Sequence, residues 1–299
     1  NDDYENMKKM CFTAFVNGIT HFDIANNYGP VYGSAEENFG KILREELGAY
    51  RDELIISTKA GFDMWEGPYG NWGSRKYLIA SLDQSLKRLG IPYVDIFYHH
   101  RMDPNTPLEE TMGALAQIVK SGKALYVGLS NYDGPTMAKA ERILDKLHVP
   151  FVINQNRYSI LDRSVENNGL LKQTYASGKG LICFSPLAQG MLTDRYLKDM
   201  PADSRAVKDG RFLHEDQVLE TRPLHNQLNE IAAGYDMKLS ELAIAWLLNK
   251  PEVTTVLIGA SKPEQIISNL KAVEKQAHTV MTDDELQKIE DAVAAFERS

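Results

Sequence analysis

The chain alternates short apolar runs with longer amphipathic stretches over almost its whole length. The short runs have the length and bounding residues of β-strands, and the stretches between them have helical spacing. This alternation is typical of parallel α/β folds, in which a helix follows each strand and covers the sheet. The runs that we predict as strands are 19–23, 54–59, 94–100, 125–130, 151–155, 181–184 and 254–258.

The pattern predicts an α/β fold of the (β/α)8 TIM barrel type that lacks its first strand. Seven strands are predicted, and the chain opens on a predicted helix over 2–17, so we expect one strand ahead of Asn1. A barrel of this kind is a single domain of roughly 250 residues or more. The 299 residues contain no linker that would divide it, and we predict one barrel domain over 1–299.

Four helix starts carry the pattern of a capping box, in which Ser or Thr is followed three residues later by Glu. The capping residues are Ser34, Thr106, Ser261 and Thr282. Two long loops, 61–73 and 185–222, follow the carboxyl ends of predicted strands. They are therefore expected to flank the face on which barrel enzymes place their active sites.

Composition restricts the class of partner. The net charge is −8, and no cluster of Lys and Arg is long enough for a nucleic-acid groove. No stretch approaches the ~20 apolar residues of a membrane span, and the first residues do not resemble a signal peptide. The two cysteines, Cys11 and Cys183, argue against a disulfide framework or a zinc site. We expect a cytoplasmic protein that binds neither nucleic acid nor membrane, and a homo-oligomer stays open.

Four residues suited to acid–base chemistry stand at or just past predicted strand ends: Asp23, Tyr28, Lys59 and His100. The carboxyl ends of all barrel strands meet at one face, so these side chains are expected to converge. Free Tyr has a pKa of about 10, and a neighbouring Lys ammonium stabilises its anion. An Asp can hold that Lys charged, and a His can orient a carbonyl or help relay a proton. The set favours carbonyl reduction.

Each of these residues has a plainer interpretation when it is taken alone. An isolated Asp or Lys at a strand end is more often salt-bridged or solvated, and Tyr28 could simply pack a loop. The pair His99 and His100 suggests a metal site. Adjacent strand residues point to opposite faces, however, so the two rings cannot easily share one ion, and we expect no metal.

No glycine-rich nucleotide motif of the Rossmann or P-loop type is present. An anion could still bind where the predicted strand 254–258 turns through Gly259 into a helix. Helix N-termini attract anions, and Lys262 adds a positive charge there. An ordinary strand-to-helix turn with a good cap is an equally good interpretation of this segment.

Three motifs resemble the aldo-keto reductase family, and the resemblance covers essentially the whole chain. Residues 18–29 (GITHFDIANNYG) resemble the motif with the catalytic Asp and Tyr, which fall on Asp23 and Tyr28. Residues 56–59 (ISTK) resemble the strand that ends in the catalytic Lys, and residues 94–103 (VDIFYHHRMD) resemble the strand with the catalytic His, which falls on His100. Further likeness in 93–110, 185–190 and 256–265 is to the branch with bacterial L-glyceraldehyde 3-phosphate reductases and potassium-channel β subunits.

The resemblance implies an oxidoreductase that reduces small aldehydes with NADPH, taking hydride from the nicotinamide and a proton from Tyr28. Substrates would be similar to L-glyceraldehyde 3-phosphate or methylglyoxal. The implied contacts to the nicotinamide are Ser130, Asn131, Gln155 and Phe184. The implied pyrophosphate loop contains Ser185, Pro186, Leu187, Gly190 and Arg195. The implied site for the adenosine 2′-phosphate contains Gly259, Ser261, Lys262, Gln265 and Asn269.

The substrate side is expected to involve the loop after Lys59, which carries Trp65 and Trp72, because large aromatics commonly line small-molecule pockets. Arg101 follows His100 and could offer a cation to a substrate phosphate, although a surface salt bridge is an equally good interpretation. The alternative function is a regulatory subunit that binds nicotinamide, similar to the channel β subunits. Those subunits have Asn where this chain has His100, which favours the reductase.

Overall fold

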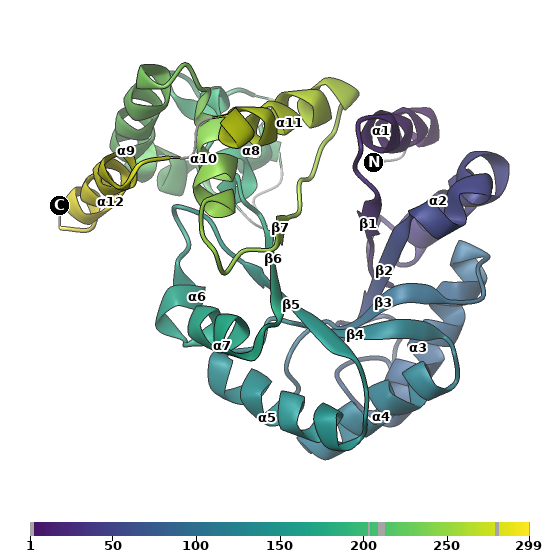
Figure 1. Cartoon of the computed structure of the whole chain (residues 1–299). Helices are drawn as coiled ribbons and strands as arrows, with labels where there is room; N and C mark the ends of the chain where they lie inside the picture. Colours follow the sequence, from purple (N-terminus) through teal and green to yellow (C-terminus); the bar gives the residue numbers. More distant parts are fainter. Residues whose placement is uncertain (1–2, 203, 209–212, 279–280, 299) are drawn as a thin grey trace. The chain divides into compact units, whose positions relative to one another are not determined.

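The computed structural model describes residues 3–202, 204–208, 213–278 and 281–298. In the described part of the chain, seven strands form one sheet in the order in which they follow one another in the sequence, and helices alternate with them (Figure 1). The strand pairs with a described register are all parallel. Seven sequential parallel strands with alternating helices are the (β/α)8 barrel fold with one strand missing, which confirms the predicted fold class.

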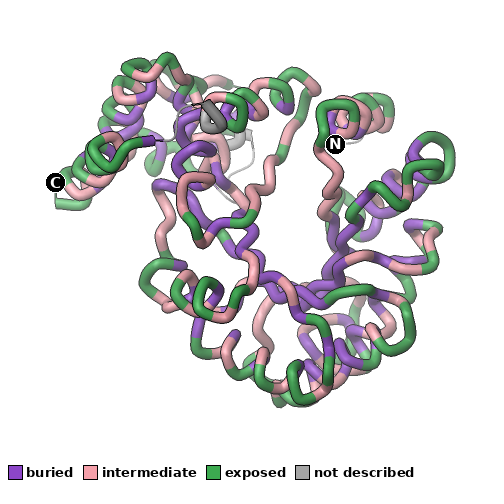
Figure 2. The backbone as a smooth tube through the Cα atoms, viewed as in Figure 1, coloured by how far each residue is buried: buried purple, intermediate pink, exposed green. Residues whose placement is uncertain are grey.

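The five strands between residues 55 and 184 are buried along most of their length, whereas the residues of the strands 21–23 and 255–256 are only half-buried (Figure 2). This burial explains their near-continuous apolar sequences, since parallel strands are normally covered on both faces. Polar residues interrupt the apolar pattern near the carboxyl ends. Ser57 and Lys59 on one strand, and Ser130 on another, have no exposed surface. Burying a polar side chain is unfavourable unless it forms hydrogen bonds, so these positions indicate a hydrogen-bonded network at the strand ends rather than apolar packing.

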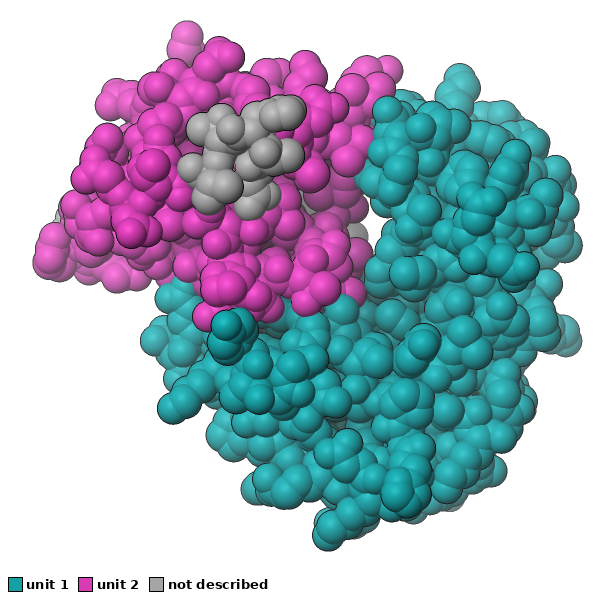
Figure 3. Space-filling view, in the orientation of Figure 1, with its two compact units in different colours: residues 1–156, 165–181, 261–263 teal, residues 157–164, 182–260, 264–299 magenta. Residues whose placement is uncertain are grey.

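The chain divides into two compact units (Figure 3). The first comprises residues 1–156, 165–181 and 261–263, and the second comprises 157–164, 182–260 and 264–299. The single domain over 1–299 stays a prediction. Every strand lies within two residues of its predicted bounds at each end.

The first unit holds the strands β1 (His21–Asp23), β2 (Ile55–Ala60), β3 (Val94–His99), β4 (Ala124–Ser130) and most of β5 (Phe151–Arg157). Its helices are α1 (Tyr4–Val16), α2 (Ser34–Ile42), α3 (Arg75–Leu89), α4 (Leu108–Lys120), α5 (Gly134–Lys146), most of α6 (Ser164–Asn167) and α7 (Leu170–Ser177). Strand register aligns the strand ends, because Asp23 pairs with Ser57, Lys59 with Tyr98 and Ser130 with Gln155.

Helix α3 shows how the sequence produces these elements. Leu78, Leu82 and Leu89 are completely buried and recur at helical spacing, so one face of the helix packs against the core. Each such side chain stabilises the fold by about 1.5–3 kcal/mol. Ser74 caps the start by accepting a hydrogen bond from the Tyr77 N–H, and Gly90 ends the helix with a φ of 69°.

The second unit holds most of β6 (Gly180–Phe184), β7 (Thr255–Val256), α8 (Arg205–Lys208), α9 (Glu215–Gly234), α10 (Leu239–Leu248), most of α11 (Pro263–His278) and α12 (Asp283–Glu297). The predicted loop 185–222 is therefore partly wrong, because it contains α8 and the start of α9. In the core of this unit Tyr158 packs edge-on against the buried Trp246 at 5.3 Å, and Lys250 lies 4.2 Å from the same ring.

The capping predictions have mixed outcomes. Thr282 caps α12 as predicted, since its hydroxyl accepts from the Glu285 N–H and the Glu285 carboxylate accepts from the Thr282 N–H. Helix α2 is instead preceded by Gly33, with a φ of 92°, and α4 by Pro107, so Ser34 and Thr106 do not cap. Helix α11 begins at Pro263, two residues after Ser261. Among the described helices, none combines the length and the apolar composition that a membrane crossing requires.

Candidate active site

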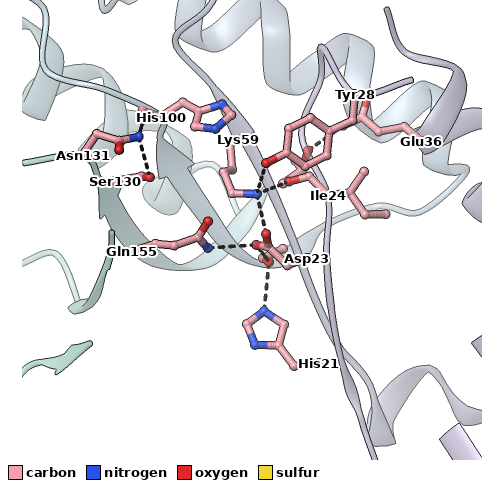
Figure 4. A network of polar contacts seen from close by, with 12 residues as sticks. His21, Asp23, Ile24, Tyr28, Glu36, Lys59, His100, Ser130, Asn131 and Gln155 are labelled. Atoms are coloured by element: carbon pink, nitrogen blue, oxygen red, sulfur yellow. Dashed lines mark hydrogen bonds and ion pairs between the residues drawn. The ribbon is translucent and has the colours of Figure 1, made fainter. Parts of the chain in front are cut away.

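Lys59 is the centre of the site. Its side chain is fully buried on β2, and Nζ donates to Asp23 Oδ2 at 2.5 Å and to the Ile24 backbone carbonyl at 2.8 Å (Figure 4). Asp23 ends β1, and its side chain is only 7% exposed. Burial alone favours the neutral amine, but the charge of Asp23 and the contact with Tyr28 outweigh it and raise the pKa of Lys59. Lys59 is therefore a buried ammonium.

Tyr28 meets this ammonium in the loop after β1. Lys59 Nζ donates to Tyr28 Oη at 3.4 Å and lies 4.8 Å from the centre of its ring (Figure 4). Tyr28 is 39% exposed, so its side chain reaches both the buried charge and the surface. A phenol in this position can give its proton to a molecule outside and leave its negative charge beside Lys59.

His100 follows directly after β3 and is 7% exposed. Its ring packs edge-on against Phe62 at 4.7 Å and lies 5.9 Å from the Tyr28 ring. Its Nδ1 atom is buried with no hydrogen-bond partner among the described residues. Burial, reinforced by the charge of Lys59, holds the pKa of His100 well below its ordinary value. The ring is therefore neutral at physiological pH.

The second carboxylate oxygen of Asp23 accepts hydrogen bonds from two further side chains. Oδ1 accepts from Ser57 Oγ at 2.6 Å and from Gln155 Nε2 at 3.2 Å. Ser57 Oγ in turn lies 2.9 Å from His21 Nε2. His21 and Ser57 were not predicted as site residues. The alternation of strand side chains could have found them, because each stands two residues before a predicted catalytic residue on the same strand face.

Three predicted nicotinamide contacts lie in the same unit beside His100. Ser130 and Gln155 are buried at the carboxyl ends of β4 and β5. Asn131 adopts a φ of 56°, and its side-chain amide donates to the His100 carbonyl at 2.9 Å and to Ser130 Oγ at 3.2 Å. The structure thus brings these residues together with Asp23, Tyr28, Lys59 and His100.

The loop after β2 holds the predicted substrate residues. Arg101 Nε donates to the Gly61 carbonyl and Nη2 to Asn71 Oδ1, both at 2.8 Å. Its guanidinium stacks 3.7 Å from the Trp72 ring. These described partners are a carbonyl, an amide and an aromatic ring, and none of them is the carboxylate that a surface salt bridge would supply.

Trp65 has a different environment from Trp72. Its ring packs against Tyr77 at 5.2 Å, and the Tyr77 hydroxyl holds the same loop by donating to the Phe62 carbonyl at 2.5 Å. Gly61 has no room for a side chain, because a Cβ there would meet the Cβ of His100 at 2.9 Å. The loop is therefore fixed closely against the strand that precedes His100.

The remaining predicted cofactor residues lie mostly in the second unit. Phe184 ends β6, and four residues of the turn after it have left-handed φ values of 46° to 98°: Ser185, Ala188, Gln189 and Gly190. Non-glycine residues adopt such angles at a cost of about 1–3 kcal/mol and cluster at functional sites. Backbone N–H groups in turns of this kind form concave anion sites, which fits a pyrophosphate. Pro186 and Leu187 belong to this turn, and Arg195 is exposed beyond it.

The predicted 2′-phosphate residues flank the start of α11. Ser261, Lys262 and Gln265 are exposed, and Asn269 is buried one helical turn after Gln265. By contacts Ser261 and Lys262 group with the first unit, and the Ser261 carbonyl accepts from Asn6 Nδ2 at 2.8 Å. A Cβ at Gly259 would meet no atom of the described residues within 4 Å, so none of these neighbours excludes a side chain there. Their contact with a phosphate stays a prediction.

His99 is separate from this chemistry. Its Nδ1 lies 2.6 Å from the Tyr132 hydroxyl, and burial lowers its pKa to about 4. In the part of the chain that the structure describes, no three metal-ligating side chains gather into a group.

The comparisons with known proteins agree with this geometry. The model of the aldo/keto reductase family matches residues 2–294. The chain is 50% identical to an L-glyceraldehyde 3-phosphate reductase of Escherichia coli O157:H7, over 97% of this chain and 84% of that protein. It is 38% identical to a Schizosaccharomyces pombe protein named for the β subunit of voltage-gated potassium channels, over 91% of this chain and 80% of that protein.

A solved structure has the same fold. The crystal structure of a thermostable aldo-keto reductase with the inhibitor epalrestat superimposes with a TM-score of 0.74, at 29% identity, over 97% of this chain and 88% of that one. A family match across nearly the whole chain, a reductase relative at 50% identity and a shared fold lead to one conclusion. The chain belongs to the aldo/keto reductase family of oxidoreductases.

Proposed function

We propose that the chain reduces small aldehydes to alcohols with NADPH and that Tyr28 supplies the proton. The observation that carries the proposal is the buried ammonium of Lys59, which bridges the Asp23 carboxylate at 2.5 Å and the Tyr28 hydroxyl at 3.4 Å. The similarity to an L-glyceraldehyde 3-phosphate reductase supports an aldehyde substrate that carries a phosphate.

The proton transfer follows from the charges. As the carbonyl oxygen gains negative charge, Tyr28 donates its O–H proton to it, and the phenolate that remains lies beside Lys59. Asp23 keeps Lys59 charged through this change, because the carboxylate cannot leave its buried ion pair. These three residues act as one unit, with Tyr28 as the proton donor.

His100 would orient the carbonyl. Its neutral ring carries one proton, and Nδ1 is buried without a partner among the described residues. An unpaired buried N–H costs more than an unpaired acceptor, so the proton belongs on Nε2. Nε2–H can then donate a hydrogen bond to the same carbonyl oxygen that Tyr28 protonates.

NADPH would supply the hydride to the carbonyl carbon when it is bound. Ser130, Asn131 and Gln155 would bind the nicotinamide amide, and Phe184 would stack on its ring. The left-handed turn 185–190 and Arg195 would hold the pyrophosphate. Gly259, Ser261, Lys262, Gln265 and Asn269 would surround the 2′-phosphate.

Substrate recognition would come from the loop after β2. Arg101 is fixed by Gly61 and Asn71 and stacked on Trp72, so its charge is held in place before a substrate arrives. A guanidinium suits the geometry of a phosphate. Trp65, on the same loop, would line the substrate pocket.

The test is a screen for NADPH oxidation against a panel of small aldehydes, including L-glyceraldehyde 3-phosphate and methylglyoxal. Steady turnover supports the reductase. Tight NADPH binding without turnover on any aldehyde would refute it and favour the regulatory subunit. We also propose a cytoplasmic location, with which the free, buried Cys11 and Cys183 are compatible.

A further inference from the structure

Two hydrogen bonds connect the Asp23 carboxylate through the Ser57 hydroxyl to the His21 ring, and the proposed proton transfer does not explain them. Strand residues two apart share a face, so His21 and Asp23 share one face of β1, and Ser57 and Lys59 share one face of β2. The register places Asp23 opposite Ser57. The four side chains therefore lie on adjoining strands, and His21 and Ser57 each stand two residues before Asp23 and Lys59. Figure 4 shows His21 below Asp23, on the side away from Tyr28.

The direction of each hydrogen bond follows from what the groups can do. An ionised carboxylate can only accept, so the single proton of the Ser57 hydroxyl points to Asp23 Oδ1 at 2.6 Å. The Ser57 oxygen can then only accept from His21 Nε2, 2.9 Å away. His21 must therefore carry a proton on Nε2. Without that donor the hydroxyl would be free to rotate away from Asp23.

We propose that His21 and Ser57 are positioning residues for the reaction, His21 orienting the Ser57 hydroxyl and Ser57 holding the Asp23 carboxylate in line with Lys59. The proposal rests on the proposed function for its effect on turnover, but not for its hydrogen bonding. A hydrogen bond to a charged group is stronger than one between neutral groups, and it fixes a rotamer that the ion pair alone would not. Gln155 supplies the second donor to Oδ1, which limits the effect of losing Ser57.

The surroundings of His21 favour the neutral form of its ring. Burial lowers the pKa of His21, and Lys59 lowers it further, whereas Asp23 and Asp95 act in the opposite direction. Asp95 lies on β3, where it is neutralised by Arg51 at 2.9 Å and accepts from the Ile56 N–H at 2.8 Å. The His21 ring is therefore neutral near pH 7.5, and it carries a single proton on either Nδ1 or Nε2.

The first experiment is independent of activity. Long-range ¹H–¹⁵N NMR of the full chain at pH 7.5 reports which ring nitrogen of His21 carries the proton, with His21→Gln used for assignment. The expected result is a protonated Nε2. A His21 ring with its proton on Nδ1 alone would overturn the proposal. A wild-type chain without turnover on any aldehyde would count against the proposed function only, and the His21 proton would still decide the hydrogen bonding.

The second experiment is a double-mutant cycle in kcat. Ser57→Ala is expected to lower kcat about tenfold with KM and the Kd for NADPH nearly unchanged. His21→Leu should have a smaller effect in the same direction, and the double mutant should be no worse than Ser57→Ala, because His21 acts only through Ser57. Losses that multiply would refute this order of action, and so would a His21→Leu variant with wild-type kcat.

Conservative variants separate positioning from folding. Ser57→Thr keeps the hydroxyl and His21→Gln keeps a donor at the reach of Nε2, so both should stay within about twofold of wild-type kcat. Thr58→Val is the matched control, because it removes a neighbouring buried hydroxyl that donates instead to Glu36 at 2.5 Å on the opposite face. Thr58→Val should keep kcat whatever its melting temperature. If it lowers kcat as much as Ser57→Ala, the effect is general loss of structure and the proposal fails.

Discussion

Replacing Lys59 by Met tests the centre of the site most directly, because the two side chains have similar length and only one is charged. Lys59 Nζ lies 3.4 Å from Tyr28 Oη. At an effective dielectric constant of about 20, a unit charge at this distance stabilises a phenolate by about 5 kcal/mol. Solvent reduces this value, because Tyr28 is 39% exposed. We expect kcat to fall between about 10² and 10⁴-fold.

The same substitution should also destabilise the fold, since it leaves the Asp23 carboxylate buried without its cation. Breaking a buried ion pair on one side costs about 3–5 kcal/mol. The lower end is expected here, because Ser57 and Gln155 still donate to Asp23. Adding Asp23→Asn removes the unpaired charge, so the double mutant should regain most of the free energy of unfolding and none of the activity.

The assays are urea denaturation and NADPH oxidation with the best aldehyde of the screen. Combining Lys59→Met with Tyr28→Phe should cost little more than either change alone, as for residues that act as one unit. Losses that multiply would refute the coupling of Lys59 to Tyr28. A Lys59→Met variant that keeps its stability but loses activity would show that Asp23 is not held as a charge by this pair.

Three further outcomes are expected. Tyr28→Phe should lower turnover about 10²–10⁴-fold while the NADPH Kd measured by fluorescence changes little, and near-normal turnover would exclude Tyr28 as the proton donor. Lys262→Ala should weaken NADPH more than NADH, because only NADPH carries the 2′-phosphate, whereas equal weakening would place Lys262 elsewhere. Arg101→Ala should raise KM for a phosphorylated aldehyde far more than for methylglyoxal, and equal effects would make the Trp72 and Asn71 contacts of Arg101 purely structural.

The sequence by itself determined the parallel α/β fold and the convergence of the predicted acid–base residues. Both follow from local pattern: apolar strand runs place Asp23, Lys59 and His100 at carboxyl ends, and in a parallel sheet those ends share one edge. Strand bounds were accurate because burial on both faces leaves a near-continuous apolar run that ends where the chain becomes polar.

Only the tertiary structure decided which groups hold those residues. Strand alternation places His21 on the face of Asp23 and Ser57 on the face of Lys59, but only the register sets Ser57 beside Asp23, and a register depends on pairing between distant segments. Helix starts were uncertain for the same reason. Thr282 caps as its motif predicts, but the left-handed Gly33 replaces Ser34, because the path of the preceding loop outweighs about 1 kcal/mol of capping energy.

The environment of Arg101 depends in the same way on folding. Its neighbour His100 was predicted from a motif, but the contacts of Arg101 with Gly61, Asn71 and Trp72 come from a loop 29 to 40 residues earlier in the chain. Nothing in the local sequence distinguishes a stacked, half-buried guanidinium from a surface salt bridge. Residue types and strand ends are local properties and can be predicted, whereas contacts made by loops require the folded chain, because they are set by the packing of distant segments.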